Sequence, residues 1–206
     1  MDIALARSWV QAIAASMNEH KDHLTQLDSA IGDADHGVNM QRGFAAALSA
    51  LDGYQAATVG DVLVKTGSTL ISVVGGAAGP LYGTLFRAMG KQLALPSVDA
   101  HQLLAALTAG LEGVQKLGAA VPGDKTMVDA LVPALTAFGE QAGAGADLSV
   151  AAASAADAAE QGMRDTVPLQ ARKGRASYLG ARSIGHQDPG ATSTALIVRA
   201  LAQVVA

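Results

Sequence analysis

Apolar residues recur at helical spacing along almost the whole of this 206-residue sequence. Met40, Phe44 and Leu51, for example, fall on one face of a helix. Alternation of apolar and polar residues, the pattern typical of strands, is nearly absent. These patterns predict an all-α fold, a single-domain barrel or bundle of eight antiparallel amphipathic helices. The helices are expected near residues 9–17, 40–51, 59–70, 76–89, 104–114, 128–135, 149–163 and 189–205.

The composition fits closely packed helices and excludes several classes of protein. Hydrophobic residues make up 50% of the chain and aromatic residues only 3%, so the core is expected to consist mainly of Ala, Leu and Val. A net charge of -4 gives no basic surface for nucleic acid, and the lack of cysteine excludes disulfides and thiolate metal sites. No apolar run approaches the ~18 residues of a membrane span, and the N-terminus lacks the basic region of a signal peptide. We expect a cytoplasmic protein that does not bind a membrane.

One domain is expected to span residues 1–206. The glycine-rich segment 139–149 is interpreted as a turn, because the sequences on its two sides have the same character. The irregular segment 167–187 is interpreted as a functional loop, since structureless loops of this length are uncommon in compact domains. Two helix starts are also indicated. Thr58 and Asp61 have the spacing of a capping box, and Asp188 precedes a proline at the first helical position.

Alternate helices of an antiparallel bundle begin at the same end, which brings four segments of this chain together. These segments are the richest in glycine and charge: GDADHGVN (32–39), SVVGGAAGP (72–80), PGDKT (122–126) and GHQDPGAT (185–192). Helix N-termini offer free N–H groups and the positive ends of helix dipoles, so a single phosphate-binding site is expected there. The glycines at positions 75, 76 and 79 would let a phosphate approach the backbone closely.

Three aspartates, Asp28, Asp33 and Asp35, stand close together just before the second predicted helix. Carboxylates this close repel one another, and they would repel a phosphate unless a hard divalent cation lay between them. Mg²⁺ binds one or two carboxylates together with phosphate oxygens. We therefore predict that the aspartates hold Mg²⁺ against the phosphates of a nucleotide.

The acidic and glycine-rich motifs also have plainer interpretations. Asp28 alone would more often be a solvated turn residue, and Asp33 or Asp35 alone could be a helix N-cap. The string GGAAG (75–79) is equally typical of close helix packing. The segment GAAVPGDKT (118–126) differs from a P-loop by one inserted aspartate, and it follows a helical pattern where a P-loop requires a strand.

The basic and histidine side chains leave two interpretations open. Lys173, Arg175 and Arg182 in the long loop are either a solvated surface or a cationic lid over phosphates. His36 and His186 lie inside the two densest motifs, where a role in the site and a structural hydrogen bond are equally expected.

Four motifs together resemble one known family. IGDADHGVNM, GGAAGPLYGT, PGDKTM and GRASYLGARSIGHQDPGA are similar, in order and across nearly the whole chain, to DhaL, the ADP-binding subunit of phosphotransferase-dependent dihydroxyacetone kinase. The resemblance implies a barrel of eight antiparallel helices. It also implies that Asp28, Asp33 and Asp35 coordinate two Mg²⁺ ions that bridge the phosphates of a tightly bound ADP.

The resemblance further implies the residues of the nucleotide pocket, to which we add Gly75, Gly76 and Thr126 from the same motifs. A serine is common in the family where Ala78 stands, so a hydroxyl contact to phosphate is expected to be replaced by the backbone N–H. Arg175 is expected to be the catalytic cation. The implied pocket residues are His36, Gly37, Val38, Asn39, Ala77, Ala78, Gly118, Met127, Arg175, Asp188, Pro189 and Gly190.

In this family the bound nucleotide acts as a prosthetic group. A phosphohistidine on a DhaM-like partner phosphorylates ADP, and the phosphoryl group passes to dihydroxyacetone held on a DhaK-like partner. The short chain is expected to need these partners, and a homodimer is compatible with the family. The alternatives are a subunit of an ATP-dependent dihydroxyacetone or fatty-acid kinase, and a non-catalytic ADP-loaded transcriptional co-regulator.

Overall fold

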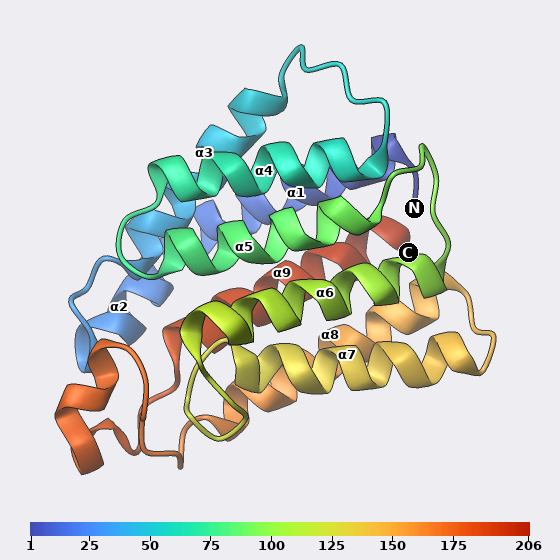
Figure 1. Cartoon of the computed structure of the whole chain (residues 1–206). Coiled ribbons are helices and arrows are strands. Elements are labelled where there is room, and N and C mark those ends of the chain that lie inside the picture. Colours follow the sequence, from blue (N-terminus) through green and yellow to red (C-terminus); the bar gives the residue numbers. More distant parts are fainter.

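Eight helices pack side by side into a closed ring, and Figure 1 shows them lying roughly parallel to one another. The computed structural model describes residues 1–206 and contains no β-strand. Contacts between neighbours follow the order α1, α3, α4, α5, α6, α7, α8 and α9, and α9 closes the ring against α1. The predicted all-α barrel is confirmed. The helices are α1 (Ile3–Glu19), α2 (Lys21–Ile31), α3 (His36–Leu51), α4 (Val59–Val73), α5 (Ala78–Gln92), α6 (Ala100–Gly118), α7 (Val128–Gly143), α8 (Leu148–Asp165), the 3-10 helix η1 (Arg175–Ser183) and α9 (Pro189–Val205).

The interior of the ring is filled mainly by small and aliphatic side chains. A single cluster of 44 buried residues, most of them Ala, Leu and Val, forms the core, as the composition predicts. Glycines let adjacent helices approach closely. A Cβ added at Gly60 of α4 would lie 2.2 Å from the Gly90 carbonyl oxygen of α5, and one added at Gly67 would lie 2.5 Å from that of Gly83. These glycines therefore fix the spacing of α4 and α5.

The predicted helix starts are confirmed. The Thr58 hydroxyl accepts a hydrogen bond from the Asp61 N–H, and the Asp61 carboxylate accepts one from the Thr58 N–H, which completes the capping box of α4. The Asp188 carboxylate accepts a hydrogen bond from the Ala191 N–H, and Pro189 is the first residue of α9.

The ring has the eight helices predicted, and the structure adds two helices outside it, the short η1 in the loop 167–187 and α2, which was not expected. It follows α1 after a break at His20 and lies outside the ring, packed chiefly against α3 and α9. Only Leu24, Asp28 and Ile31 of α2 are buried. A helix with so small an apolar face and a buried aspartate gives almost no periodic hydrophobic signal.

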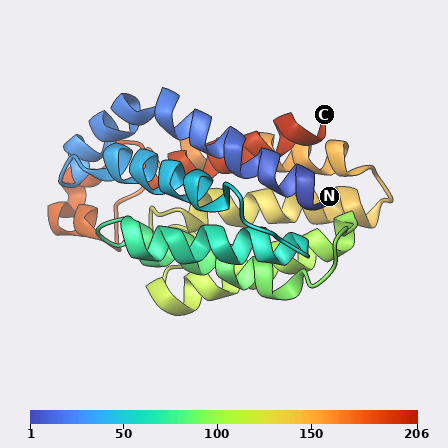
Figure 2. The same cartoon turned by 90° about the horizontal axis from the view of Figure 1, so that it is seen from above.

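The helices α3, α5, α7 and α9 begin at one end of the ring, where the loop 167–187 and α2 also lie (Figure 1). Figure 2 shows the two chain termini at the opposite end. The structure thus brings together the four segments that the sequence predicted to converge. None of the helices combines the length and the apolar character that crossing a membrane requires.

Candidate functional site

A cavity of about 500 Å³ opens at the end where α3, α5, α7 and α9 begin. Its wall also takes in the last turns of α2 and α6 and part of the loop 167–187. The predicted helix N-termini are thus the walls of one cavity. The predicted site residues that line it are Asp28, Asp33, Asp35, His36, Asn39, Gly75, Gly76, Ala77, Ala78, Gly118, Thr126, Met127, Arg175, Asp188, Pro189 and Gly190.

Two of the predicted site residues, Gly37 and Val38, lie outside the cavity wall. Gly37 is the point where α3 meets α2, and a Cβ added there would lie 2.0 Å from the Lys21 carbonyl oxygen. Val38 is exposed on the surface of α3. Gly37 therefore serves the packing that presents α2 to the cavity, and the side chain of Val38 faces away from the buried face of α3.

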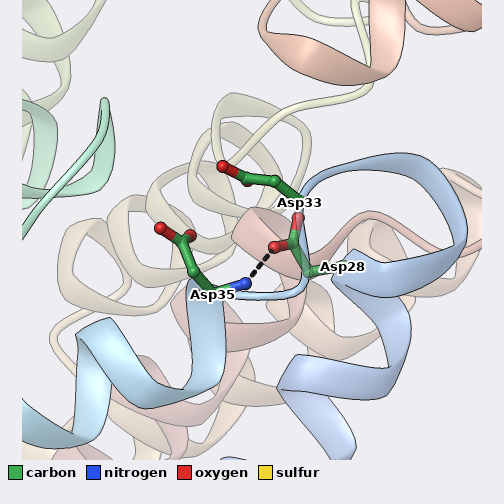
Figure 3. Close-up of side chains that lie close together, drawn as sticks. All are labelled: Asp28, Asp33 and Asp35. Atoms are coloured by element: carbon green, nitrogen blue, oxygen red, sulfur yellow. Dashed lines mark hydrogen bonds between the residues drawn. The ribbon is translucent and has the colours of Figure 1, made fainter.

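The three aspartates gather at the turn between α2 and α3, as Figure 3 shows. One carboxylate oxygen from each lies within 4.8 Å of the others. Asp28 is buried, and its Oδ2 accepts hydrogen bonds from the N–H groups of Asp35 (2.9 Å) and His36 (3.2 Å). Asp28 thus caps the start of α3, the role that Asp35 was considered for. The carboxylate of Asp35 makes no cap hydrogen bond.

The aspartate cluster fits a hard divalent cation. Two oxygens bound to one Mg²⁺ lie at most about 4.2 Å apart, since each Mg–O distance is about 2.1 Å. The carboxylate oxygens of the three aspartates lie up to 4.8 Å apart, which is slightly longer. Because Asp33 and Asp35 are exposed, small rotations of their side chains would bring these oxygens within reach of one ion. A set made only of carboxylate oxygens suits Mg²⁺, Ca²⁺ or Mn²⁺ better than zinc.

Arg175 connects the loop to this cluster. Its Nε lies 3.0 Å from Asp33 Oδ2, in an ion pair between two partly exposed side chains. Lys173 and Tyr178 also line the cavity, whereas Arg182 does not. Of the three basic residues considered for a lid, two are therefore at the cavity. The surface interpretation holds for Arg182.

A buried polar network lies behind the wall formed by α3 and α9. The His36 ring contacts Ser193 Oγ through Nε2 at 2.9 Å, and the Tyr82 hydroxyl lies 2.7 Å from the same Oγ and donates to the Gly190 carbonyl oxygen at 2.8 Å. Burial lowers the pKa of His36, although Asp28 acts in the opposite direction, and burial raises the pKa of Tyr82. Burial thus favours the neutral form of the His36 ring, and the contact with Ser193 fixes its orientation.

Asp188 is the buried carboxyl group at the N-terminus of α9. Its Oδ2 accepts a hydrogen bond of 2.6 Å from the Ala191 N–H. Burial raises the pKa of Asp188 to about 7, despite this hydrogen bond and the nearby Lys125 ammonium, which both favour the charged form. The cavity floor therefore contains a carboxyl group that changes its charge near neutral pH.

Sequence reasoning missed several residues of the cavity. Ile31, Leu81, Val114 and Val128 contribute apolar wall, and their apolar character alone marked them only as core. Tyr82 could have been found as the one polar aromatic group within the GGAAGPLYGT motif. Lys125 was placed in the converging segment PGDKT and in a string resembling a P-loop, but was not singled out. Its Nζ donates to backbone carbonyl oxygens, including those of Thr166 (2.9 Å) and Ser183 (2.8 Å), instead of facing a phosphate.

Comparisons with known proteins place these features in a wider context. Residues 30–203 match the family described as the DAK2 domain. The chain is 43% identical over 196 residues to the ADP-binding subunit DhaL of the PEP-dependent dihydroxyacetone kinase of Escherichia coli, covering 95% of this chain and 93% of that protein. It is 42% identical over 198 residues to the corresponding subunit of dihydroxyacetone kinase 1 of Listeria innocua, covering 96% of this chain and 94% of that protein.

A solved structure shares the fold. The dihydroxyacetone kinase from C. freundii in complex with AMP-PNP and Mg²⁺ superposes with a TM-score of 0.74 and 29% sequence identity. The match covers 97% of this chain but only 34% of that longer one. The eight-helix ring is therefore also found as one part of a larger kinase chain.

Proposed function

The chain belongs to the DAK2 domain family, and from this premise we propose that it is the ADP-binding phosphotransfer subunit of a phosphoenolpyruvate-dependent dihydroxyacetone kinase. The observation that carries the proposal is the placement of three carboxylates beside four helix N-termini around one cavity. Carboxylates attract cations and helix N-termini attract anions, so their combination suits a complex of Mg²⁺ with the phosphates of a nucleotide.

In the proposed site Asp28, Asp33 and Asp35 hold two Mg²⁺ ions, which would neutralise the phosphates of ADP when bound. Asp28 is the fixed member, because its second oxygen is engaged by two backbone N–H groups. Asp33 and Asp35 are exposed and can adjust to the ions. The backbone N–H groups at Ala77 and Ala78, where α5 begins at the cavity wall, would donate hydrogen bonds to the phosphates.

Arg175 is the proposed catalytic cation. It pairs with Asp33 at 3.0 Å and is carried by a loop that borders the cavity. A guanidinium group in this position can stabilise the negative charge on a phosphoryl group during its transfer. Such cations contribute strongly to catalysis of phosphoryl transfer. We propose that the phosphoryl group comes from a phosphohistidine on a DhaM-like partner and goes to dihydroxyacetone on a DhaK-like partner.

Reconstitution tests this function. The purified chain is mixed with DhaK-like and DhaM-like proteins and the phosphotransferase components, and the formation of dihydroxyacetone phosphate is followed with phosphoenolpyruvate or with ATP. Repeated turnover that requires phosphoenolpyruvate and the DhaM-like protein is expected. The Asp33→Asn variant is expected to be inactive, and Asp22→Asn, at an exposed acid of α2, is the matched control.

A second candidate is the nucleotide-binding subunit of an ATP-dependent kinase. It is favoured by the similarity to the longer C. freundii kinase, whose structure contains AMP-PNP and Mg²⁺. In the same reconstitution, repeated turnover with ATP alone, without the DhaM-like protein, would identify this alternative.

A further inference from the structure

Lys125 is a buried cation with no carboxylate within ion-pair distance, although Asp188 and Asp129 lie near enough to attract it. The residue is 1% exposed, and none of the ion pairs in the structure includes it. Its backbone φ of 63° lies in the left-handed region, which a residue other than glycine rarely adopts. Burial of an ammonium group is costly unless its donors are satisfied, so the surroundings of Lys125 must supply acceptors.

Those acceptors are five backbone carbonyl oxygens, which come from the two ends of a single loop. Nζ donates to Thr166 (2.9 Å), Val167 (3.5 Å) and Leu169 (3.1 Å) on the outgoing side of the loop. On the returning side it donates to Ser183 (2.8 Å) and to His186. An ammonium group has three N–H donors, so some of these contacts share a donor. The lysine thus satisfies carbonyl oxygens on both ends of the loop with one ammonium group.

Further hydrogen bonds hold the two loop ends around the lysine. The Gly185 N–H donates to the Val167 carbonyl oxygen at 2.8 Å, and the Ala171 N–H donates to Ser183 Oγ at 2.9 Å. The Arg172 N–H donates to the Asp124 carbonyl oxygen at 3.0 Å, which ties the loop to the residue before the lysine. The ends of the loop are therefore closed, and the residues between them project as a unit.

The projecting part of the loop carries the groups that border the cavity. Lys173, Arg175 and Tyr178 all line it, and Arg175 reaches Asp33. On the other side of Lys125, Thr126 and Met127 form the cavity wall where α7 begins. Lys125 thus connects the fixed wall of the cavity to the loop that borders it.

We infer that Lys125 is a positioning residue for the nucleotide site: its ammonium group, held by the carbonyl oxygens of residues 166–186, closes the loop and sets Arg175 over the aspartate cluster. The inference deepens the proposed function and rests on it for the identity of the ligand. The closure of the loop is a property of the protein alone.

Hydrogen exchange of the ligand-free protein, followed by mass spectrometry, tests the closure. In Lys125→Met, which keeps the length of the side chain but not its charge, peptides covering residues 166–187 are expected to exchange at least about tenfold faster. Peptides of α4 and α5 are expected to exchange as in the wild type. Lys91→Met, at an exposed lysine of α5, is the matched control and should change neither. If Lys125→Met does not fold, Lys125→Gln, which retains N–H donors, takes its place.

Two outcomes of the exchange experiment would overturn the inference. One is unchanged exchange in the loop. The other is faster exchange throughout the helices, which would make Lys125 a residue of general stability and not of loop position.

Binding measurements then separate the inference from the proposed function. Mn²⁺ binding to the aspartate cluster, measured by electron paramagnetic resonance without nucleotide, is expected to be at least as strong in Lys125→Met, because Arg175 no longer competes for Asp33, while Mg·ADP affinity falls at least about tenfold. Equal Mg·ADP affinity in both proteins would overturn the positioning role. A wild-type protein that binds no Mg·ADP at all would refute the proposed function and leave the exchange result to decide the closure of the loop.

Discussion

At the scale of single residues, the aspartate cluster depends on a glycine that gives it room. A Cβ added at Gly32 would lie 2.0 Å from Asp28 Oδ1, the oxygen that accepts neither of the two backbone hydrogen bonds. Gly32 therefore leaves that oxygen free to bind a metal. The sequence predicted the three aspartates as a group, since their spacing is visible. It gave no reason to single out Gly32, because the contact depends on the turn between α2 and α3.

We expect Gly32→Ala to displace the Asp28 carboxylate. The affinity for Mg²⁺ or Mn²⁺, measured by calorimetric titration, should fall at least about tenfold, and the free energy of unfolding should fall by about 1–3 kcal/mol because of overpacking. Gly143→Ala is the control, since a Cβ there meets no atom within 4 Å. Unchanged metal affinity in Gly32→Ala would show that Asp28 is not a ligand.

Asp188 predicts a pH dependence of stability. Its pKa of about 7 in the folded protein is above its ordinary value of 3.8, so between pH 4 and 7 the folded state keeps a proton that the unfolded chain has lost. The contribution of Asp188 to the free energy of unfolding therefore falls as pH rises through this range, by up to about 1.4 kcal/mol per pH unit. That contribution is fully present below pH 4.

Urea denaturation of the metal-free protein from pH 4.5 to 7.5 measures this effect. Asp188→Asn keeps an oxygen that can accept the Ala191 N–H but does not titrate. The free energy of unfolding of the wild type, measured relative to that of the variant, should fall steadily as pH rises. Parallel curves would mean that Asp188 is ionised throughout the range.

At the scale of helices, the sequence predicted best where apolar periodicity is strong. The eight ring helices and two of their caps follow from apolar spacing and from the short motifs Thr58–Asp61 and Asp188–Pro189. The helix α2 has three buried residues and one of them is an aspartate, so periodicity could not reveal it. That helix nevertheless supplies Asp28. The aspartate cluster was predicted from its motif, whereas the helix that carries Asp28, its most buried member, was not.

The contact between α5 and α9 provides a prediction at this scale. The Tyr82 hydroxyl donates to the Gly190 carbonyl oxygen and also lies within 3.0 Å of Thr194 Oγ1. Tyr82→Phe leaves the Gly190 carbonyl oxygen and the Thr194 hydroxyl without this partner, so the free energy of unfolding should fall by about 1–3 kcal/mol. Tyr178→Phe, at a tyrosine that is 86% exposed, should change it by less than about 0.5 kcal/mol. Equal effects of the two substitutions in chemical denaturation would contradict this role of the hydroxyl.

At the scale of the whole molecule, the closed ring explains why the predicted site residues lie at one end. Alternation of helix direction places the starts of α3, α5, α7 and α9 together, and the cavity draws residues from position 28 to position 190 into one wall. This convergence was predictable, because it needs only the number and direction of the ring helices. The contacts of Lys125 with the two loop ends were not predictable, since backbone carbonyl groups leave no mark on a sequence.

The most direct test of the central claim is native mass spectrometry of the wild type and of Asp33→Asn after incubation with Mg²⁺ and ADP and removal of free ligand. The wild type is expected to carry about one ADP and about two Mg²⁺ ions per chain, and the variant to carry neither, because Asp33 is a proposed ligand beside the nucleotide. A wild-type protein that emerges without nucleotide, or a variant that retains it equally well, would contradict the account of the aspartates and helix N-termini as a magnesium–nucleotide site.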